Sequence, residues 1–189
     1  MGGLDDWKWK LTEAVERLRT RYEHIGRKTG APFLAIVYPP EAERSVLKEW
    51  RTLATTLDQE FSIQHVDVLE VTTEVVRRIG SDALVDSMNH PMPGSDPTTE
   101  LGTMWTMEVA ARVREASKRP GPLRPVVVLE RLAALYPASG PHALMQALWD
   151  DEQVPDCPVM LLIPGVIVEA RVYRFVGQVE EFMYRGDIL

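Results

Sequence analysis

Cysteine is almost absent from this chain. Cys157 is the one cysteine among 189 residues, so no intramolecular disulfide can form and nothing points to an oxidising compartment. No stretch approaches the roughly 18 consecutive apolar residues that a membrane-spanning helix needs. The first ten residues are charged and do not resemble a secretory signal. We therefore expect a cytoplasmic protein that does not enter a membrane.

An excess of positive charge is also lacking. The net charge of -7 leaves no overall field that would attract phosphate backbones, although a local patch could still do so. Hydrophobic residues make up 45% and charged residues 26%, which is close to the globular average and argues against disorder, collagen-like sequence and coiled coil. The length predicts one compact domain over residues 1–189.

The hydrophobic pattern alternates between strands and helices. Apolar runs at 33–38, 125–129 and 158–163 have the length and composition of strands buried on both faces. Residues 62–68 alternate polar and apolar side chains, which predicts a strand with one wetter face, towards the sheet edge. Apolar residues recur at helical spacing over 4–25, 41–59, 71–79, 104–113 and 141–149.

This order predicts the fold class. Strands that alternate with helices favour a three-layer α/β domain with a mainly parallel sheet of about five strands and helices on both faces. The last predicted strand, 172–176, follows the previous strand so closely that it must run antiparallel. The pattern breaks over 80–99, where 88–97 is rich in proline and turn formers, so we predict one long loop that is either a mobile insertion or a binding surface.

Motifs for nucleotide or metal binding are missing. Gly26-Arg-Lys-Thr29 echoes the end of a phosphate-binding loop, but Arg21 stands where that loop has glycine, and the segment ends a helix instead of opening one. No two histidines are spaced i, i+4 and none has a cysteine partner, so neither a metal site nor a cofactor is predicted. The histidines are His24, His65, His90 and His142.

Candidate catalytic residues are few. Asp156 beside Cys157 discourages the thiolate, and His65 is interpreted as a hydrogen-bonded structural residue. We therefore predict that the chain is not an enzyme. The alternative is a degenerate nucleotide-binding or hydrolytic domain in which Glu130 is the general base, because it directly follows a predicted central strand. That site would use the crevice after Tyr38, Leu129 and Ile163, and a salt bridge from Glu130 to an arginine is the competing interpretation.

One basic stretch could contact nucleic acid. It holds five cations and a single acid, Glu115. Cations are common in the last turn of a helix, however, and no aromatic residues alternate with them to stack on bases. The residues of this second alternative are Arg112, Arg114, Lys118, Arg119 and Arg124.

Three segments in order resemble one family across nearly the whole chain. They are Tyr38-Pro-Pro-Glu-Ala-Glu-Arg44, Val127-Val-Leu-Glu-Arg-Leu-Ala-Ala-Leu-Tyr-Pro137 running to His142, and Leu162-Ile-Pro-Gly165 with Tyr173-Arg-Phe-Val-Gly177 and Tyr184-Arg185. Together they are similar to the BrxB family of BREX phage-defence systems. Ala138-Ser-Gly140 is less hydrophobic than the usual family continuation, and Gly186-Asp-Ile-Leu189 is not the common family ending.

The resemblance implies a non-catalytic assembly component of a BREX anti-phage defence complex. Its partners would be other BREX proteins, most plausibly the alkaline-phosphatase-like PglZ, with DNA contact only indirect. Interfaces favour aromatic and arginine residues, and these gather towards the C-terminus. In the strand 172–176 such residues alternate, so one of its faces is core. The predicted partner contacts are Tyr136, Tyr173, Arg174, Phe175, Tyr184 and Arg185.

Overall fold

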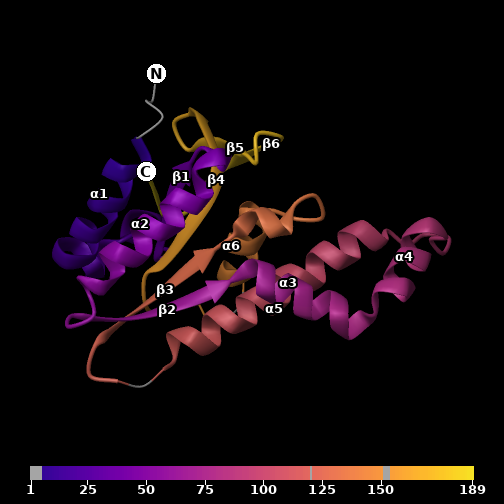
Figure 1. The fold of residues 1–189 in the computed structure, drawn as a ribbon, viewed down its shortest axis with the longest axis horizontal. Helices are drawn as coiled ribbons and strands as arrows, with labels where there is room; N and C mark the ends of the chain where they lie inside the picture. Colours follow the sequence, from indigo (N-terminus) through magenta and orange to yellow (C-terminus); the bar gives the residue numbers. More distant parts are fainter. Residues whose placement is uncertain (1–5, 120, 151–153) are drawn as a thin grey trace.

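A mainly parallel sheet organises the molecule (Figure 1). In the computed structural model, which describes residues 6–119, 121–150 and 154–189, the strand order is β2-β3-β4-β1-β7, and every neighbour in that row is parallel. Strand β4 continues beyond this row and pairs antiparallel with β5, which pairs with β6. The strands are β1 (Phe33–Tyr38), β2 (Phe61–Asp67), β3 (Arg124–Glu130), β4 (Val159–Glu169), β5 (Val172–Phe175), β6 (Val179–Phe182) and β7 (Asp187–Ile188).

Helices cover both faces of the sheet, which confirms the predicted three-layer α/β class. Helices α1 and α2 share one core with alternate residues of β1, including Leu34 and Ile36. The other residues of β1, including Phe33 and Ala35, face a second core with α3, α5 and α6. The helices are α1 (Asp6–Arg21), α2 (Glu43–Thr55), α3 (Val68–Ile79), α4 (Ser81–Asn89), α5 (Pro97–Ser117) and α6 (Pro141–Trp149).

Two described strands were not predicted from the sequence. Strand β6 reads Val-Glu-Glu-Phe and has no buried residue, so it carries no apolar run. Strand β7 has two residues and pairs parallel with β1 through Asp187 and Ile188. The predicted strand at 172–176 does run antiparallel to β4, although it is not the last strand.

The predicted long loop over 80–99 is wrong. Helix α4 occupies 81–89, and α5 begins at Pro97, so only 90–96 lies outside a helix after Ser81. Proline at a first helical position fits the helix and does not break it. Asp96 caps α5, since its Oδ1 accepts a hydrogen bond from the Thr99 backbone N–H at 3.2 Å. The turn formers therefore make a short loop, 90–96, that ends in the capped start of α5.

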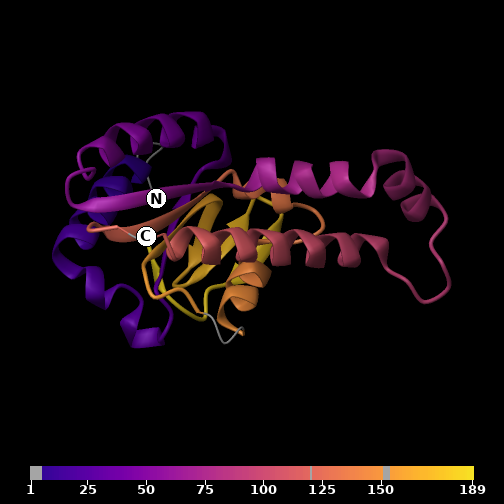
Figure 2. The same ribbon diagram turned by 90° about the horizontal axis from the view of Figure 1, so that it is seen from below.

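Helices α3 and α5 extend side by side beyond the sheet, with α4 at their far end (Figures 1 and 2). We call residues 76–100 the arm. None of these residues is buried, whereas α3 buries Val68, Val71 and Val75 before the arm begins. The arm thus adds nothing to either core.

We predict that Trp50→Ala lowers the free energy of unfolding by about 3–5 kcal/mol, because the Trp50 side chain is fully buried between α2 and the sheet. Trp50→Phe should cost less, since it keeps most of the ring and removes an indole N–H that has no acceptor. Urea denaturation measures both. Trp9→Ala, at a residue 57% exposed, is the control and should change stability by less than about 0.5 kcal/mol. Equal effects at the two tryptophans would contradict this packing.

Candidate functional site

Glu130 is the most distinctive polar residue at the carboxyl edge of the sheet. It is the last residue of β3 and is 2% exposed. Its Oε1 lies 2.7 Å from Nδ1 of His65, and its Oε2 accepts a hydrogen bond from Nη2 of Arg51 at 3.1 Å. Both predictions for these residues are confirmed: Glu130 forms a salt bridge with an arginine, and His65 is hydrogen-bonded.

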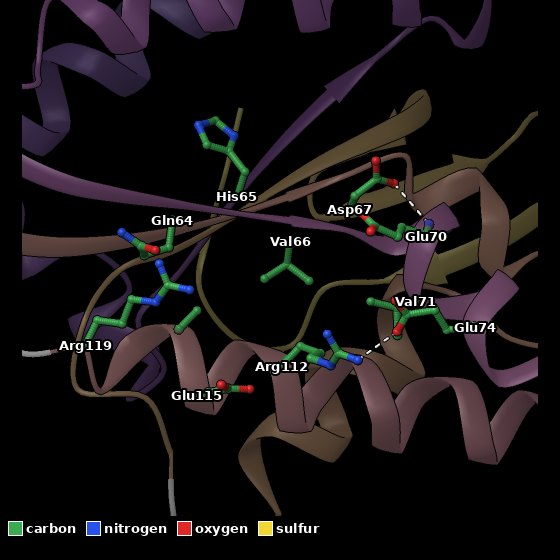
Figure 3. Close-up of a pocket in the computed structure, with 11 residues that line it drawn as sticks. Gln64, His65, Val66, Asp67, Glu70, Val71, Glu74, Arg112, Glu115 and Arg119 are labelled. Carbon is green, nitrogen blue, oxygen red and sulfur yellow. Dashed lines mark hydrogen bonds and ion pairs between the residues drawn. The ribbon is translucent and has the colours of Figure 1, made fainter. Parts of the chain in front are cut away.

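The regular alternation of β2 puts His65 in reach of Glu130. Strands β2 and β3 are in parallel register, with Asp67 opposite Glu130. Successive side chains of a strand point to opposite faces, so His65 and Asp67 share one face while Gln64 and Val66 take the other. Figure 3 shows the His65 ring on the far side of β2 from Val66.

The surroundings of Glu130 keep its carboxylate charged. Burial alone would raise its pKa, but the hydrogen bond and charge of His65, followed by those of Arg51, outweigh burial and hold the pKa below its ordinary value. An ionised carboxylate can only accept hydrogen bonds, so Nδ1 of His65 carries the shared proton. The cluster therefore compensates a buried charge inside the fold.

Arg131, the next residue, has an unusual backbone. Its φ of 58° lies in the left-handed region, which costs a non-glycine residue about 1 kcal/mol. Its Nη2 contacts Asp67, a carboxylate that also caps α3 by accepting from the Glu70 N–H at 3.3 Å. The chain then enters the short 3-10 helix Leu132–Leu135. Arg131 therefore ties the end of β3 to the start of α3.

Glu130 and His65 together resemble the carboxylate and the base of a proton-transfer site. Glu130 orients the His65 ring, and the His65 side chain is 38% exposed. Among the described residues, however, no serine, threonine or cysteine side chain hydrogen-bonds to His65. Cys157 is buried, and burial raises the pKa of its thiol to about 11, as the sequence predicted in direction. A hydrolytic site would need its nucleophile from elsewhere.

The predicted crevice at the strand ends is partly filled. Tyr38, Leu129 and Ile163 are all fully buried. Strand β4 does not stop at the edge but continues past Pro164, which pairs with Tyr38, towards the hairpin of β5 and β6. The continuing strand therefore occupies part of the edge at which such sheets hold ligands.

The basic stretch does not form one surface. Arg112 is paired with Glu74 at 2.7 Å and with Glu108 at 3.5 Å. Arg114 donates to the Ala147 carbonyl, and Arg124 lies over the rings of Tyr22 and Phe61. Lys118 and Arg119 are exposed.

Figure 3 shows the hollow that Arg112 and Arg119 do share. It has a volume of about 200 Å³ and lies between β2, α3 and α5. Acidic side chains, among them Glu74 and Glu115, line it together with the two arginines. Carboxylates in this position repel a phosphate backbone, which disfavours nucleic-acid contact.

The predicted partner contacts divide between core and surface. Tyr173 and Phe175 are buried, at 0% and 1% exposure, and cannot reach a partner on the folded surface. Strand alternation explains this correction, because both side chains lie on the core face of β5. The Tyr173 hydroxyl donates to Glu181 at 2.6 Å, and Glu181 also accepts from the backbone N–H of His142. Through Glu181, the hairpin of β5 and β6 is therefore held against the start of α6.

The remaining predicted contacts are accessible. Tyr136 is 41% and Tyr184 66% exposed, and Arg174 is exposed and paired with Glu180 at 2.6 Å. Arg185 lies over the Trp149 ring at 3.9 Å. Tyr184 contacts the rings of Phe182 and His142, which makes a small aromatic surface at the end of the chain.

The described residues show two further absences. No group of three histidine, cysteine or carboxylate side chains among them is arranged to hold a metal ion. No described helix has both the length and the apolar character needed to cross a membrane.

We predict that Glu130→Gln lowers the free energy of unfolding by about 1–3 kcal/mol at pH 7, because a charged buried acceptor with two partners is lost. The folded pKa of Glu130 lies below its unfolded value of about 4.3, so its stabilisation is complete above that pH and is lost as the pH falls through the folded pKa. Urea denaturation at pH 7 and pH 3 should therefore show a smaller difference from wild type in acid. Glu49→Gln, at an exposed residue of α2, is the control. A difference that is constant with pH would contradict the assignment.

Comparison with known proteins does not change this description. No protein-family model, curated protein sequence or solved structure matches the chain.

Proposed function

We propose that the chain is a non-catalytic component of a BREX anti-phage assembly, and that it acts by binding the alkaline-phosphatase-like protein PglZ. The family resemblance supplies the identity of the partner. The arm is the single observation that carries a docking role.

The arm presents apolar side chains that the described part of the chain leaves uncovered. Val85 is 57%, Met88 41% and Met92 75% exposed, and all three lie on α4 or directly after it. Two further methionines, Met104 and Met107, are exposed on the adjoining part of α5. Flexible methionine side chains are common on surfaces that bind other proteins, because they adapt to the shape of a partner.

The energetics of the arm favour a bound state. Helix α4 has nine residues and buries none, while isolated helices shorter than about 12–15 residues are marginal in water. No residue of the arm is buried, so little apolar burial offsets the conformational entropy that its ordering costs. A partner that covers Val85, Met88 and Met92 would supply the missing apolar burial.

The rest of the molecule supports a non-catalytic role. Glu130 and His65 are used to compensate a buried charge, and β4 occupies part of the sheet edge at the strand ends. The aromatic surface around Tyr184 is a second, smaller candidate contact. Of the contacts predicted from the sequence, this surface contains Tyr184.

We predict that Met88→Glu combined with Met92→Glu weakens binding to PglZ from the same operon by at least about tenfold, because charges replace the apolar surface of the arm. Pull-down followed by titration calorimetry measures the loss. The fold should persist, since neither residue is buried, and circular dichroism with thermal unfolding checks this.

Two further variants make the outcome decisive. Trp9→Ala removes an exposed aromatic residue from α1 and should leave binding unchanged. Tyr184→Ala tests the aromatic surface: loss of binding there alone would place the contact at the end of the chain and not on the arm. No association of the wild-type proteins at micromolar concentration would refute the proposed function.

A further inference from the structure

Helix α2 and the 3-10 helix Leu132–Leu135 border a groove that none of the roles above uses. Two adjoining hollows, of about 730 Å³ and 650 Å³, share Arg44, Leu47 and Arg131 in their lining, so they form one continuous depression. We call it the α2 groove. It lies over the face of the sheet on which Arg51 reaches Glu130.

Positive charge is concentrated along one wall of the groove. Arg44, Lys48 and Arg51 are four and three residues apart on α2, so they form a stripe along one side of the helix. Arg131 faces them from the end of β3. The whole chain has a net charge of -7, so this wall is a local exception to its electrostatic field.

Several of these cations have spare hydrogen-bonding capacity. Among the described residues, no carboxylate forms an ion pair with Arg44 or Lys48. Arg51 pairs with Glu130, and Arg131 pairs with Asp67 and also interacts electrostatically with Glu43.

The floor of the groove is apolar. Leu47 lies between the two hollows, and Leu69, Ala133 and Ala134 continue the floor towards Pro40. Leu69 is 44% exposed. A ligand that covered this floor would need apolar groups in addition to negative charge.

These features favour a peptide over a nucleic acid. Glu41 and Glu43 line the far end of the groove, so its positive wall is short and suits the separate carboxylates of a peptide better than a continuous phosphate backbone. No aromatic side chain lines either hollow, so no base could stack there. A peptide in which carboxylates alternate with apolar side chains can pair with the cations of the wall and cover the apolar floor.

We propose that the α2 groove binds an acidic, partly apolar segment of a partner protein. The carboxylates of the segment pair with Arg44, Lys48 and Arg131, and its apolar side chains cover Leu47 and Leu69. This site is distinct from the arm and does not depend on the identity of the partner that binds there.

The test uses the full chain and a fluorescein-labelled peptide of Glu-Glu-Leu repeats, about 15 residues long, in fluorescence anisotropy. Binding should weaken as salt is added, because the contact is largely ionic. Arg44→Glu combined with Lys48→Glu should reduce the affinity by at least about tenfold. Leu47→Ser keeps every charge and should reduce it by roughly threefold, because the apolar floor is lost.

The matched control reverses the same number of charges elsewhere. Arg21→Glu combined with Lys28→Glu, at exposed residues outside the groove, should change the affinity by less than about twofold. An equal loss in this control would mean that only the overall charge matters, which overturns the proposal. Failure of the peptide to bind the wild-type chain, or tighter binding of an oligo-dT single strand than of the peptide, would overturn it as well.

Discussion

A negative charge buried at the end of β3 constrains the edge of this sheet. Glu130 is almost inaccessible, and an uncompensated carboxylate in that position would cost several kcal/mol. Compensation comes from two directions, with His65 on the neighbouring strand and Arg51 on the helix that crosses above. Strand register and helix packing must both be correct for the charge to be accommodated, so the cluster couples β2, β3 and α2. An apolar residue at position 130 would need no such partners. The pairing of Glu130 therefore favours the observed arrangement of β2, β3 and α2.

The same cluster shows how far sequence reasoning extends. Glu130 directly follows a buried apolar run, and this position predicted a carboxylate at the carboxyl edge of the sheet. The sequence allowed either a general base or a salt bridge to an arginine there, and the structure confirms the salt bridge. The alternation in β2 predicted a polar face for His65. Neither pattern could indicate that the two side chains meet, because that contact depends on the parallel register of β2 and β3. The choice of Arg51 depends on how α2 crosses the sheet, which periodicity does not encode.

The central strands were predictable because strands buried on both faces are continuous apolar runs with sharp ends. Phe33–Tyr38 is such a run, and its predicted bounds match those of β1. The arm was not predictable for the opposite reason. Helix α4 buries no side chain, so no apolar stripe marks it, and Pro97 was interpreted as a break although it occupies the first turn of α5. Strands β6 and β7 escaped prediction because backbone pairing to strands distant in sequence, and not their composition, defines them.

The arm and the α2 groove differ in chemistry, and this difference bears on how an assembly subunit could work. Apolar contacts such as those of Met88 and Met92 provide affinity that depends little on salt, because they remove surface from water. Charged contacts such as those of Arg44 and Lys48 contribute more to the association rate and to the choice of partner, and they weaken as ionic strength rises. Binding at both proposed surfaces would let the chain hold one protein firmly while it exchanges another. Salt dependence therefore separates the two surfaces: a complex formed through the arm persists at high ionic strength, whereas one formed through the groove dissociates.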